Sequence, residues 1–225
     1  MPKARQIKRE HMDLSSAIRF MREPVFDKAN LLSNVYYRAK GAFIYRMFFG
    51  HFGKGSLIRS PIFIKHPRFI SIGNHVFIRD GARLEIVYTG DQPDPGLHIG
   101  DRTNIEQGVH IVCHRKVWIG SEVSIAGHCC IVDVTHPYDD INETTKIGLR
   151  IKSGDAFVNI GDGAFIGFGA VILPNVTVGR RAIVGANSVV VRDVPEFCVA
   201  AGAPARIIKR YDFNAKTWVN ADSKE

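Results

Sequence analysis

The chain has 225 residues, of which 45% are hydrophobic and 23% charged, and its formal net charge is +8. This length fits one substantial core and is too short for two large domains. No uncharged apolar run approaches the roughly 18 residues that span a bilayer, and no apolar stretch follows the basic residues near Met1. We therefore expect neither a transmembrane helix nor a cleaved secretion signal.

The positive charge is confined to the first part of the chain. Residues 1–60 contain 12 Lys or Arg against 4 Asp or Glu, whereas the remainder contains 18 of each. A uniformly basic surface would indicate nucleic-acid binding, which we do not expect here. A basic lead before a neutral body indicates a local partner, such as an anionic membrane face or a neighbouring subunit, or else a solvated flank.

The N-terminal region, residues 1–58, is expected to be helical. Asp13 suits the N-cap of a short helix over residues 14–22, and Pro24 suits the first turn of a second helix that runs to about Phe49. Apolar residues recur in the second helix at spacings of three and four, with basic residues near its aromatic end. Such a segment can cap the repeats that follow, which we favour, or lie on an anionic membrane surface.

Repeats with a period of six occupy residues 59–210. From Ile160 to Pro195, six consecutive hexads each open with Ile or Val. Neither an α-helix nor an amphipathic strand has this period, whereas a parallel β-helix with three short strands per coil does. Earlier guide residues follow the same spacing, at Ile72, Ile78, Leu84, Ile99, Ile105, Ile111, Ile119, Ile125 and Ile131. We expect an all-β fold, a parallel β-helix of about five coils.

Two loops interrupt these coils, and a glycine recurs at the same position of each coil. The loops are expected at residues 87–98 and 136–158, and a short C-terminal tail at 211–225. In each coil a glycine follows the first guide residue, which indicates a corner that other residues tolerate poorly, at Gly73, Gly100, Gly120, Gly161 and Gly179. Function on such a scaffold belongs to loops and corners.

Three segments carry a family resemblance: IGSEVSIAGHCCIVDVTHP at 119–137, the hexads at 160–195, and VPEFCVAAGAPARIIKR at 194–210. Through them the chain resembles the hexapeptide-repeat acyltransferases, especially the sugar and surface-polysaccharide O-acetyltransferases of the galactoside and maltose type. The resemblance implies a left-handed β-helix, acetyl-CoA as acyl donor without a metal, and a homotrimer with active sites between subunits.

The resemblance also implies catalytic residues. In the family a His followed by Pro lies where a coil ends and a loop begins, and His136 with Pro137 fills that position. Neutral imidazole can remove the proton of an attacking hydroxyl. The sequence has no Ser or Cys in a strained strand-to-helix turn that would serve as a nucleophile, so we expect direct transfer without a covalent intermediate. Asp133 either orients the imidazole or is a turn residue. Glu106 occupies the position of an acceptor-binding Asn, where a carboxylate could bind sugar hydroxyls or hold the imidazole tautomer.

Counting hexads along each coil places Glu106 at the second corner of its coil and His136 at the third. Neighbouring subunits are therefore needed to bring the two residues together. For the donor, the resemblance implies an aromatic wall, groove positions near the pantetheine arm and cations near the phosphates: Phe165, Phe168, Ala186, Arg192, Arg206 and Lys209. Gly202 and Pro204 are expected to shape the turn after the last coil.

We therefore expect an O-acetyltransferase acting on a sugar or a surface polysaccharide of capsule, O-antigen or exopolysaccharide type, in the cytoplasm at the inner membrane face. One alternative is an N-acetyltransferase acting on an amino-sugar nucleotide. Others are a non-catalytic β-helix scaffold and a γ-class carbonic anhydrase with zinc on His110, His114 and His128. The cysteines lack CxxC spacing and are interpreted as reduced packing residues: Cys113, Cys129, Cys130 and Cys198.

Overall fold

The computed structural model describes residues 24–90, 95–152 and 154–221, so the expected helix after Asp13 lies outside it. The chain divides into two compact units, one ending at Tyr36 and one beginning at Tyr37. Helix α2 (Val25–Lys40) crosses this boundary and has no buried residue. It is followed by a π-helical turn, η1 (Gly41–Tyr45), and by α3 (Arg46–Phe48). No described helix is long and apolar enough to cross a membrane.

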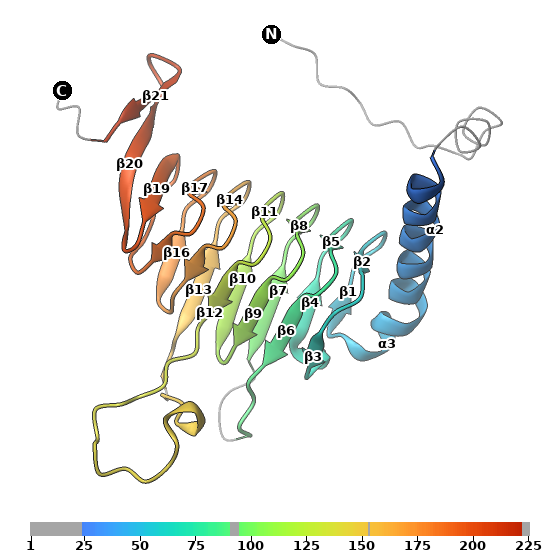
Figure 1. The fold of residues 1–225 in the computed structure, drawn as a ribbon, viewed down its shortest axis with the longest axis horizontal. Coiled ribbons are helices and arrows are strands. Elements are labelled where there is room, and N and C mark those ends of the chain that lie inside the picture. The colour runs from blue at the N-terminus through green and yellow to red at the C-terminus, as the bar shows by residue number, and fades with distance from the viewer. Residues whose placement is uncertain (1–23, 91–94, 153, 222–225) are drawn as a thin grey trace. The chain divides into compact units, whose positions relative to one another are not determined.

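The unit from Tyr37 is a stack of coils whose strands form three sheets (Figure 1). Sheet A contains β1 (His51–Phe52), β4 (Ile70–Ile72), β7 (Gly96–Ile99), β10 (Lys116–Ile119), β13 (Phe157–Ile160) and β16 (Val176–Val178). Sheet B contains β2 (Leu57–Ile58), β5 (Phe77–Ile78), β8 (Asn104–Ile105), β11 (Ser124–Ile125), β14 (Phe165–Ile166), β17 (Ile183–Val184), β19 (Cys198–Gly202), β20 (Ala205–Asp212) and β21 (Thr217–Asn220). Sheet C contains β3 (Phe63–Lys65), β6 (Arg83–Ile86), β9 (His110–Cys113), β12 (Cys130–Val132), β15 (Val171–Ile172) and β18 (Val189–Val190).

Each coil runs through sheets A, B and C in turn, so the three sheets form the faces of a triangular prism. Each corner is named by the two sheets that it joins: A/B, B/C and C/A. All pairs from β1 to β18 are parallel and join one coil to the next. The six coils exceed the expected five by one, because the helix begins at His51 rather than after residue 58. The hexad pattern missed this first coil because its first guide residue is Phe52 in place of Ile or Val. Gly53, directly after it, was the available signal.

The guide residues fill the interior of the prism. Those from Ile72 to Val190 are 0–1% exposed, and the residues on either side of them in each strand point outward. Burying an Ile or Val side chain contributes about 1.5–3 kcal/mol, and here the contribution recurs in every strand. A shift of one residue would turn a whole row outward, so the apolar rows determine the register.

The corner glycines are needed because successive coils approach closely. A Cβ on Gly161 would lie 2.6 Å from the backbone nitrogen of Arg180, and the other glycines of this A/B corner meet the next coil in the same way, at Gly53, Gly73, Gly100, Gly120 and Gly179. None of these positions has the positive φ that glycine favours. The expectation of a constrained corner is therefore confirmed, and the constraint is backbone contact between coils.

The end of the segment before β1, from Gly41 to Phe49, packs on the first coil, whereas helix α2 has no buried residue. The rings of Tyr45, Phe49 and Phe52 are buried and lie 5.4–5.5 Å apart, and they belong to the same core as the guide residues. Phe43 and Met47, one helical turn apart, are each 76% exposed. The aromatic end of the lead segment thus has one face in the core and one in solvent.

The C-terminal end departs from the expected tail. Strand β20 pairs antiparallel with β19, and β21 pairs antiparallel with β20, so residues up to Asn220 extend sheet B. This hairpin covers the open edge of the sheet, which protects its unpaired backbone groups. Gly202, with φ of 102°, and the cis bond before Pro204 form the turn between β19 and β20, as expected.

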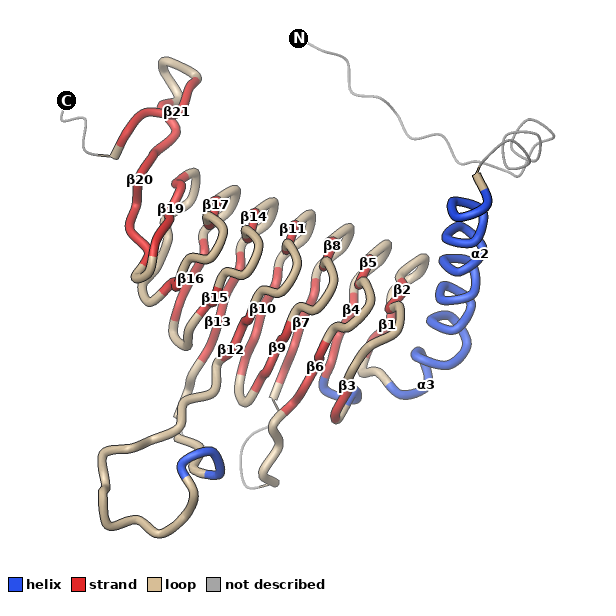
Figure 2. The backbone as a smooth tube through the Cα atoms, in the orientation of Figure 1, coloured by secondary structure: helices blue, strands red, loops and turns tan. Residues whose placement is uncertain are grey.

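Both large insertions leave the prism at the C/A corner, one between β6 and β7 and one between β12 and β13, where the two loops are expected (Figure 2). The longer loop extends away from the coils and includes the single turn η3 (Ile147–Leu149).

Candidate functional site

His136 lies at the root of the long loop, four residues after β12, and its side chain is exposed. Its Nδ1 is 2.8 Å from the carbonyl oxygen of Arg150, at the far end of the same loop. A carbonyl oxygen can only accept, so Nδ1 carries the proton and the lone pair of the neutral ring lies on Nε2. Within the described part of the chain Nε2 has no hydrogen-bond partner. The fold thus presents an exposed imidazole in a defined tautomer, with an unprotonated Nε2.

Arg150 holds the loop that supplies this carbonyl group, a role that the sequence did not indicate. Its guanidinium donates to the carbonyl oxygens of Thr145 at 2.7 Å, Asp140 at 3.2 Å and Glu143 at 2.5 Å. The amide of Lys152 also donates to the carbonyl oxygen of Thr135 at 3.0 Å, which joins the two ends of the loop. Arg150 therefore positions His136 through the backbone. An arginine in a non-repetitive loop carries no periodic signal that would reveal this.

Asp133 is a turn residue in this structure rather than a partner of the imidazole. Its buried carboxylate accepts hydrogen bonds from the backbone amides of His114 at 2.5 Å, Arg115 at 2.7 Å and Lys116 at 2.7 Å. No hydrogen bond joins Asp133 to His136 among the described residues. Of the two expected roles, the hydrogen bonds support the turn, because both carboxylate oxygens are already engaged with the previous coil.

Glu106 and His136 lie at different corners of the coils, as the count of hexads predicted. Glu106 follows β8 at the B/C corner, whereas His136 follows β12 at the C/A corner. The carboxylate of Glu106 pairs with Arg79 at 2.7 Å, and both side chains are about 40% exposed. Such an exposed pair contributes about 0–1 kcal/mol to stability, so it mainly orients the carboxylate at this corner.

Three of the expected donor residues gather on sheet B and its B/C corner. Phe165 begins β14 and is 45% exposed, and Phe168 follows that strand at the corner. Ala186 lies at the same corner one coil later and is exposed. The ring of Phe168 meets His128 edge to face at a centroid distance of 5.4 Å. Together with Glu106, these residues form one exposed strip along the prism.

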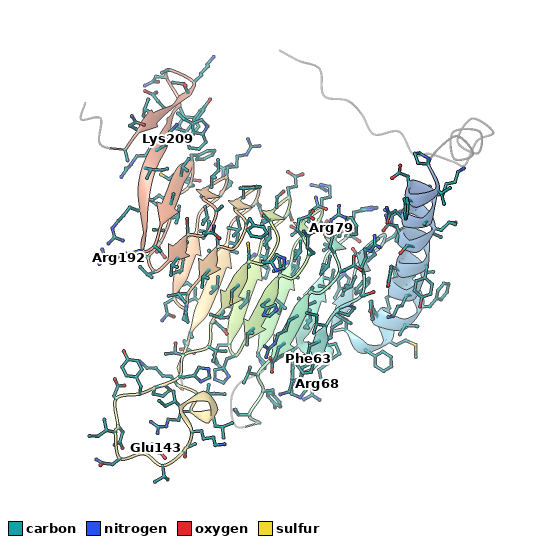
Figure 3. The ribbon with its side chains drawn as sticks, viewed as in Figure 1. Phe63, Arg68, Arg79, Glu143, Arg192 and Lys209 are labelled. Carbon is teal, nitrogen blue, oxygen red and sulfur yellow. The ribbon has the colours of Figure 1, made fainter. Side chains whose placement is uncertain are left out.

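The three cations are distributed over two places. Arg192 follows β18 at the C/A corner, across sheet C from Phe168 and Ala186. Arg206 and Lys209 lie on β20, in the C-terminal hairpin, and are exposed. Figure 3 labels Arg192 and Lys209 near the same end of the coil stack. The described chain therefore places Arg206 and Lys209 on the same sheet as Phe165, whereas Arg192 lies at another corner.

The outer face of sheet C separates these two corners and, apart from His110 on β9, is apolar over its last four coils. Its outward positions hold half-buried small hydrophobic side chains, at Val112, Cys130, Val132, Val171 and Val189. The earlier coils carry charged residues there instead, including Arg83 and the buried Glu85, which pair with each other. A contiguous apolar face on a sheet indicates a contact surface.

The cysteines contribute to packing. Cys113, Cys129 and Cys198 are buried, and Cys130 is half-buried. Burial raises the pKa of all four thiols above the ordinary value, which disfavours the reactive thiolate. The described residues include no group of three or more His, Cys, Asp or Glu able to hold a metal ion. His114 and His128 lie at different corners, and His110 lies on β9.

Comparisons with known proteins indicate the family to which the chain belongs. Residues 157–192 match the family described as bacterial transferase hexapeptide (six repeats). WbbJ of Escherichia coli (strain K12), whose name assigns it to O-acetyl transfer in lipopolysaccharide biosynthesis, is 32% identical over 73% of this chain and 84% of its own length. Galactoside O-acetyltransferase of the same strain is 33% identical over 57% of this chain and 61% of its own. A serine acetyltransferase of Haemophilus influenzae is 51% identical over 52% of this chain but 38% of its own.

A solved structure shares the fold. A variant of AntD, an N-acyltransferase from Bacillus cereus in complex with dTDP and coenzyme A, aligns with a TM-score of 0.62 over 76% of this chain and 89% of its own, at 21% identity. The chain therefore belongs to the bacterial transferase hexapeptide family. The predicted left-handed parallel β-helix is confirmed, and so is the expectation of an acyltransferase.

The tautomer of His136 can be tested by ¹⁵N chemical shifts of its ring nitrogens, assigned by comparison with His136→Asn. We expect the neutral wild-type ring to be protonated on Nδ1. Arg150→Ala removes the three bonds that hold the loop, so the ring should become a mixture of both tautomers. Lys152→Ala, which removes a nearby exposed cation, should leave the shifts unchanged. A wild-type ring protonated mainly on Nε2 would contradict this geometry.

Proposed function

We propose that this protein transfers an acetyl group from acetyl-CoA to a hydroxyl of a sugar or surface polysaccharide, with His136 as the general base. The observation that carries the proposal is the bond from Nδ1 to the carbonyl of Arg150, which leaves Nε2 as the proton acceptor. The names of two relatives, WbbJ and galactoside O-acetyltransferase, support O-acetyl transfer to such an acceptor.

The reaction is direct. The acceptor oxygen attacks the thioester carbonyl carbon while Nε2 removes the hydroxyl proton. The tetrahedral intermediate collapses with cleavage of the C–S bond, and the imidazolium returns the proton to the departing thiolate. The oxygen gains the acetyl group, the donor leaves as free coenzyme A, and His136 returns to its neutral form. No residue is acylated, in agreement with the raised pKa values of the cysteines.

The strip on sheet B suits the donor. Phe165 and Phe168 offer exposed aromatic surface to the pantetheine arm, and the small Ala186 leaves room beside it. Arg206 and Lys209 provide positive charge for the phosphates at one end of the strip. Glu106 lies on the same strip, where its carboxylate can accept hydrogen bonds from acceptor hydroxyl groups.

A homotrimer completes the site. Sheet C lies between the B/C corner, which carries Glu106 and Phe168, and the C/A corner, which carries His136 and Arg192. If three copies place the apolar faces of sheet C around a threefold axis, the B/C corner of one copy meets the C/A corner of the next. The base and Arg192 then join the donor strip of a neighbour, which one chain cannot achieve.

In this proposal the protein acts at the inner face of the cytoplasmic membrane. Phe43 and Met47 are exposed on the solvent face of the lead segment, beside the basic residues Lys40 and Arg46. Apolar and basic side chains together favour the surface of an anionic bilayer.

The first prediction concerns catalysis. His136→Asn should lower acceptor-dependent thiol release from acetyl-CoA about 10²- to 10⁴-fold, because the base is lost. His75→Asn replaces another exposed histidine, at the A/B corner, and should leave the rate unchanged. The acceptor panel contains sugars, capsule-type oligosaccharides, amino-sugar nucleotides and L-serine. Release with amines alone would establish the N-acetyltransferase alternative, and no release with any acceptor would favour a scaffold.

The second prediction concerns assembly. Val171→Asp places a charge on the apolar face of sheet C and should convert a trimer of the 25.1 kDa chain into monomers in sedimentation. Thiol release should fall with it. Asn159→Asp places the same charge on sheet A in the same coil and should preserve the trimer. A wild-type protein that is a stable, active monomer would refute the intersubunit site.

The third prediction concerns the membrane. Phe43→Ser combined with Met47→Ser should reduce binding to phosphatidylglycerol vesicles in a flotation assay, because the exposed apolar pair is lost. Ile141→Ser, which changes a 92% exposed residue in the long loop, is the matched control. Equal binding of the double variant and the control would exclude this surface as the membrane contact.

A further inference from the structure

A pocket of about 680 Å³ lies on the outer face of sheet A, away from the donor strip on sheet B. Its lining comes from four successive coils, with Ser71 on β4, His98 on β7, Trp118 on β10 and Phe157 on β13. Neighbouring strands are about 4.8 Å apart, so the pocket extends over about 14 Å along the prism. A pocket of this length is suited to a chain of several units.

Gly96 is one of the residues that line this pocket. It occupies an outward position of β7, in register with the exposed Lys116 on β10. A Cβ at Gly96 would have no atom within 4 Å, and its φ is not in the left-handed region. The missing side chain therefore leaves open space on an otherwise covered row, and a larger residue can be introduced without backbone strain.

The walls combine aromatic surface with hydrogen-bonding groups. The rings of His98 and Trp118 are stacked, with centroids 3.8 Å apart and planes 15° apart, and Trp118 is 43% exposed. Burial lowers the pKa of His98, which keeps its imidazole uncharged and suited to stacking. Ser71, in register with His98 on the preceding coil, adds a hydroxyl group. Aromatic surface with a few polar groups is typical of sites for small organic ligands.

The charge in the pocket is positive overall. Arg115 pairs with Asp155 at 2.9 Å, and Lys116 adds a second cation with an exposed side chain. The pocket thus offers two cations against one carboxylate, which favours a ligand with negative groups.

The pocket is joined to the His136 loop. Asp155 and Ala156 line it and are also the last residues of that loop, whose ends are held together at Thr135 and Lys152. From these contacts we propose that the pocket binds an acidic saccharide chain, as a subsite for acceptor units beyond the one that is acetylated. This inference rests on the proposed function and makes its acceptor an anionic oligosaccharide or polysaccharide rather than a single sugar.

Binding can be measured without acetyl-CoA, so the test does not depend on transfer. The probes are oligogalacturonates of one to six units, maltooligosaccharides of the same lengths as neutral counterparts, and dTDP. We expect the oligogalacturonates to bind, with affinity that rises from one to three units and falls with added salt. Gly96→Leu fills the pocket and should weaken binding at least 10-fold.

The two tryptophans of the chain provide a matched pair for fluorescence. Oligogalacturonate should change the emission of wild type and Trp218→Phe, whereas Trp118→Phe should lose the response. Trp218 lies on β21 and packs against Tyr211, away from sheet A. Gly96→Leu and Trp118→Phe should bind acetyl-CoA as wild type does, which shows that they fold.

The proposal is overturned if oligogalacturonates do not bind, if Gly96→Leu binds them like wild type, or if only the neutral chains or dTDP bind. Failure of the proposed function gives a different result, because saccharide binding would persist while no acceptor released thiol from acetyl-CoA. The converse result, thiol release with equal KM for one sugar unit and for a hexamer in both wild type and Gly96→Leu, would refute the subsite alone.

Discussion

The period of six residues is the constraint on which the rest of this structure depends. One guide residue per strand points inward, and each strand of the stack bonds to the same strand of the next coil, so the strands find their backbone partners in the neighbouring coils. Every coil must therefore have the same length between corners. Insertions are tolerated only where a corner opens, and both large loops leave at the C/A corner. The regular part supplies a rigid frame, and the longer irregular loop carries His136.

This division explains how an exposed imidazole is held in place on this fold. His136 is exposed, yet its ring is held because Arg150 gathers the loop carbonyl groups and offers its own to Nδ1. Asp133 stabilises the corner from which the loop departs, by accepting the amides of the preceding coil. Neither residue needs to touch a substrate to matter, since both determine where the imidazole lies.

The three faces of the prism differ in character. Sheet B carries exposed aromatic rings and ends in a basic hairpin, sheet C is apolar over its later coils, and sheet A carries a stacked His98 and Trp118 beside two cations. A single coil could not make these distinctions, because one or two outward residues per strand are too little surface for a ligand. Repetition along the prism converts single outward residues into strips, and each strip can take a different partner.

The sequence by itself determined the β-helix, the corner glycines, the position of the loops and the placement of His136 at the root of the longer loop. Ile and Val at a fixed period leave no other fold, and a His before Pro at a loop root is a local pattern. Only the tertiary structure decided the roles of Arg150 and Asp133, the first coil around Phe52, the hairpin in place of a tail and the sheet A pocket. These depend on which outward residues align between coils and on backbone carbonyls brought together by a loop, and neither relation has a spacing that can be read along one chain.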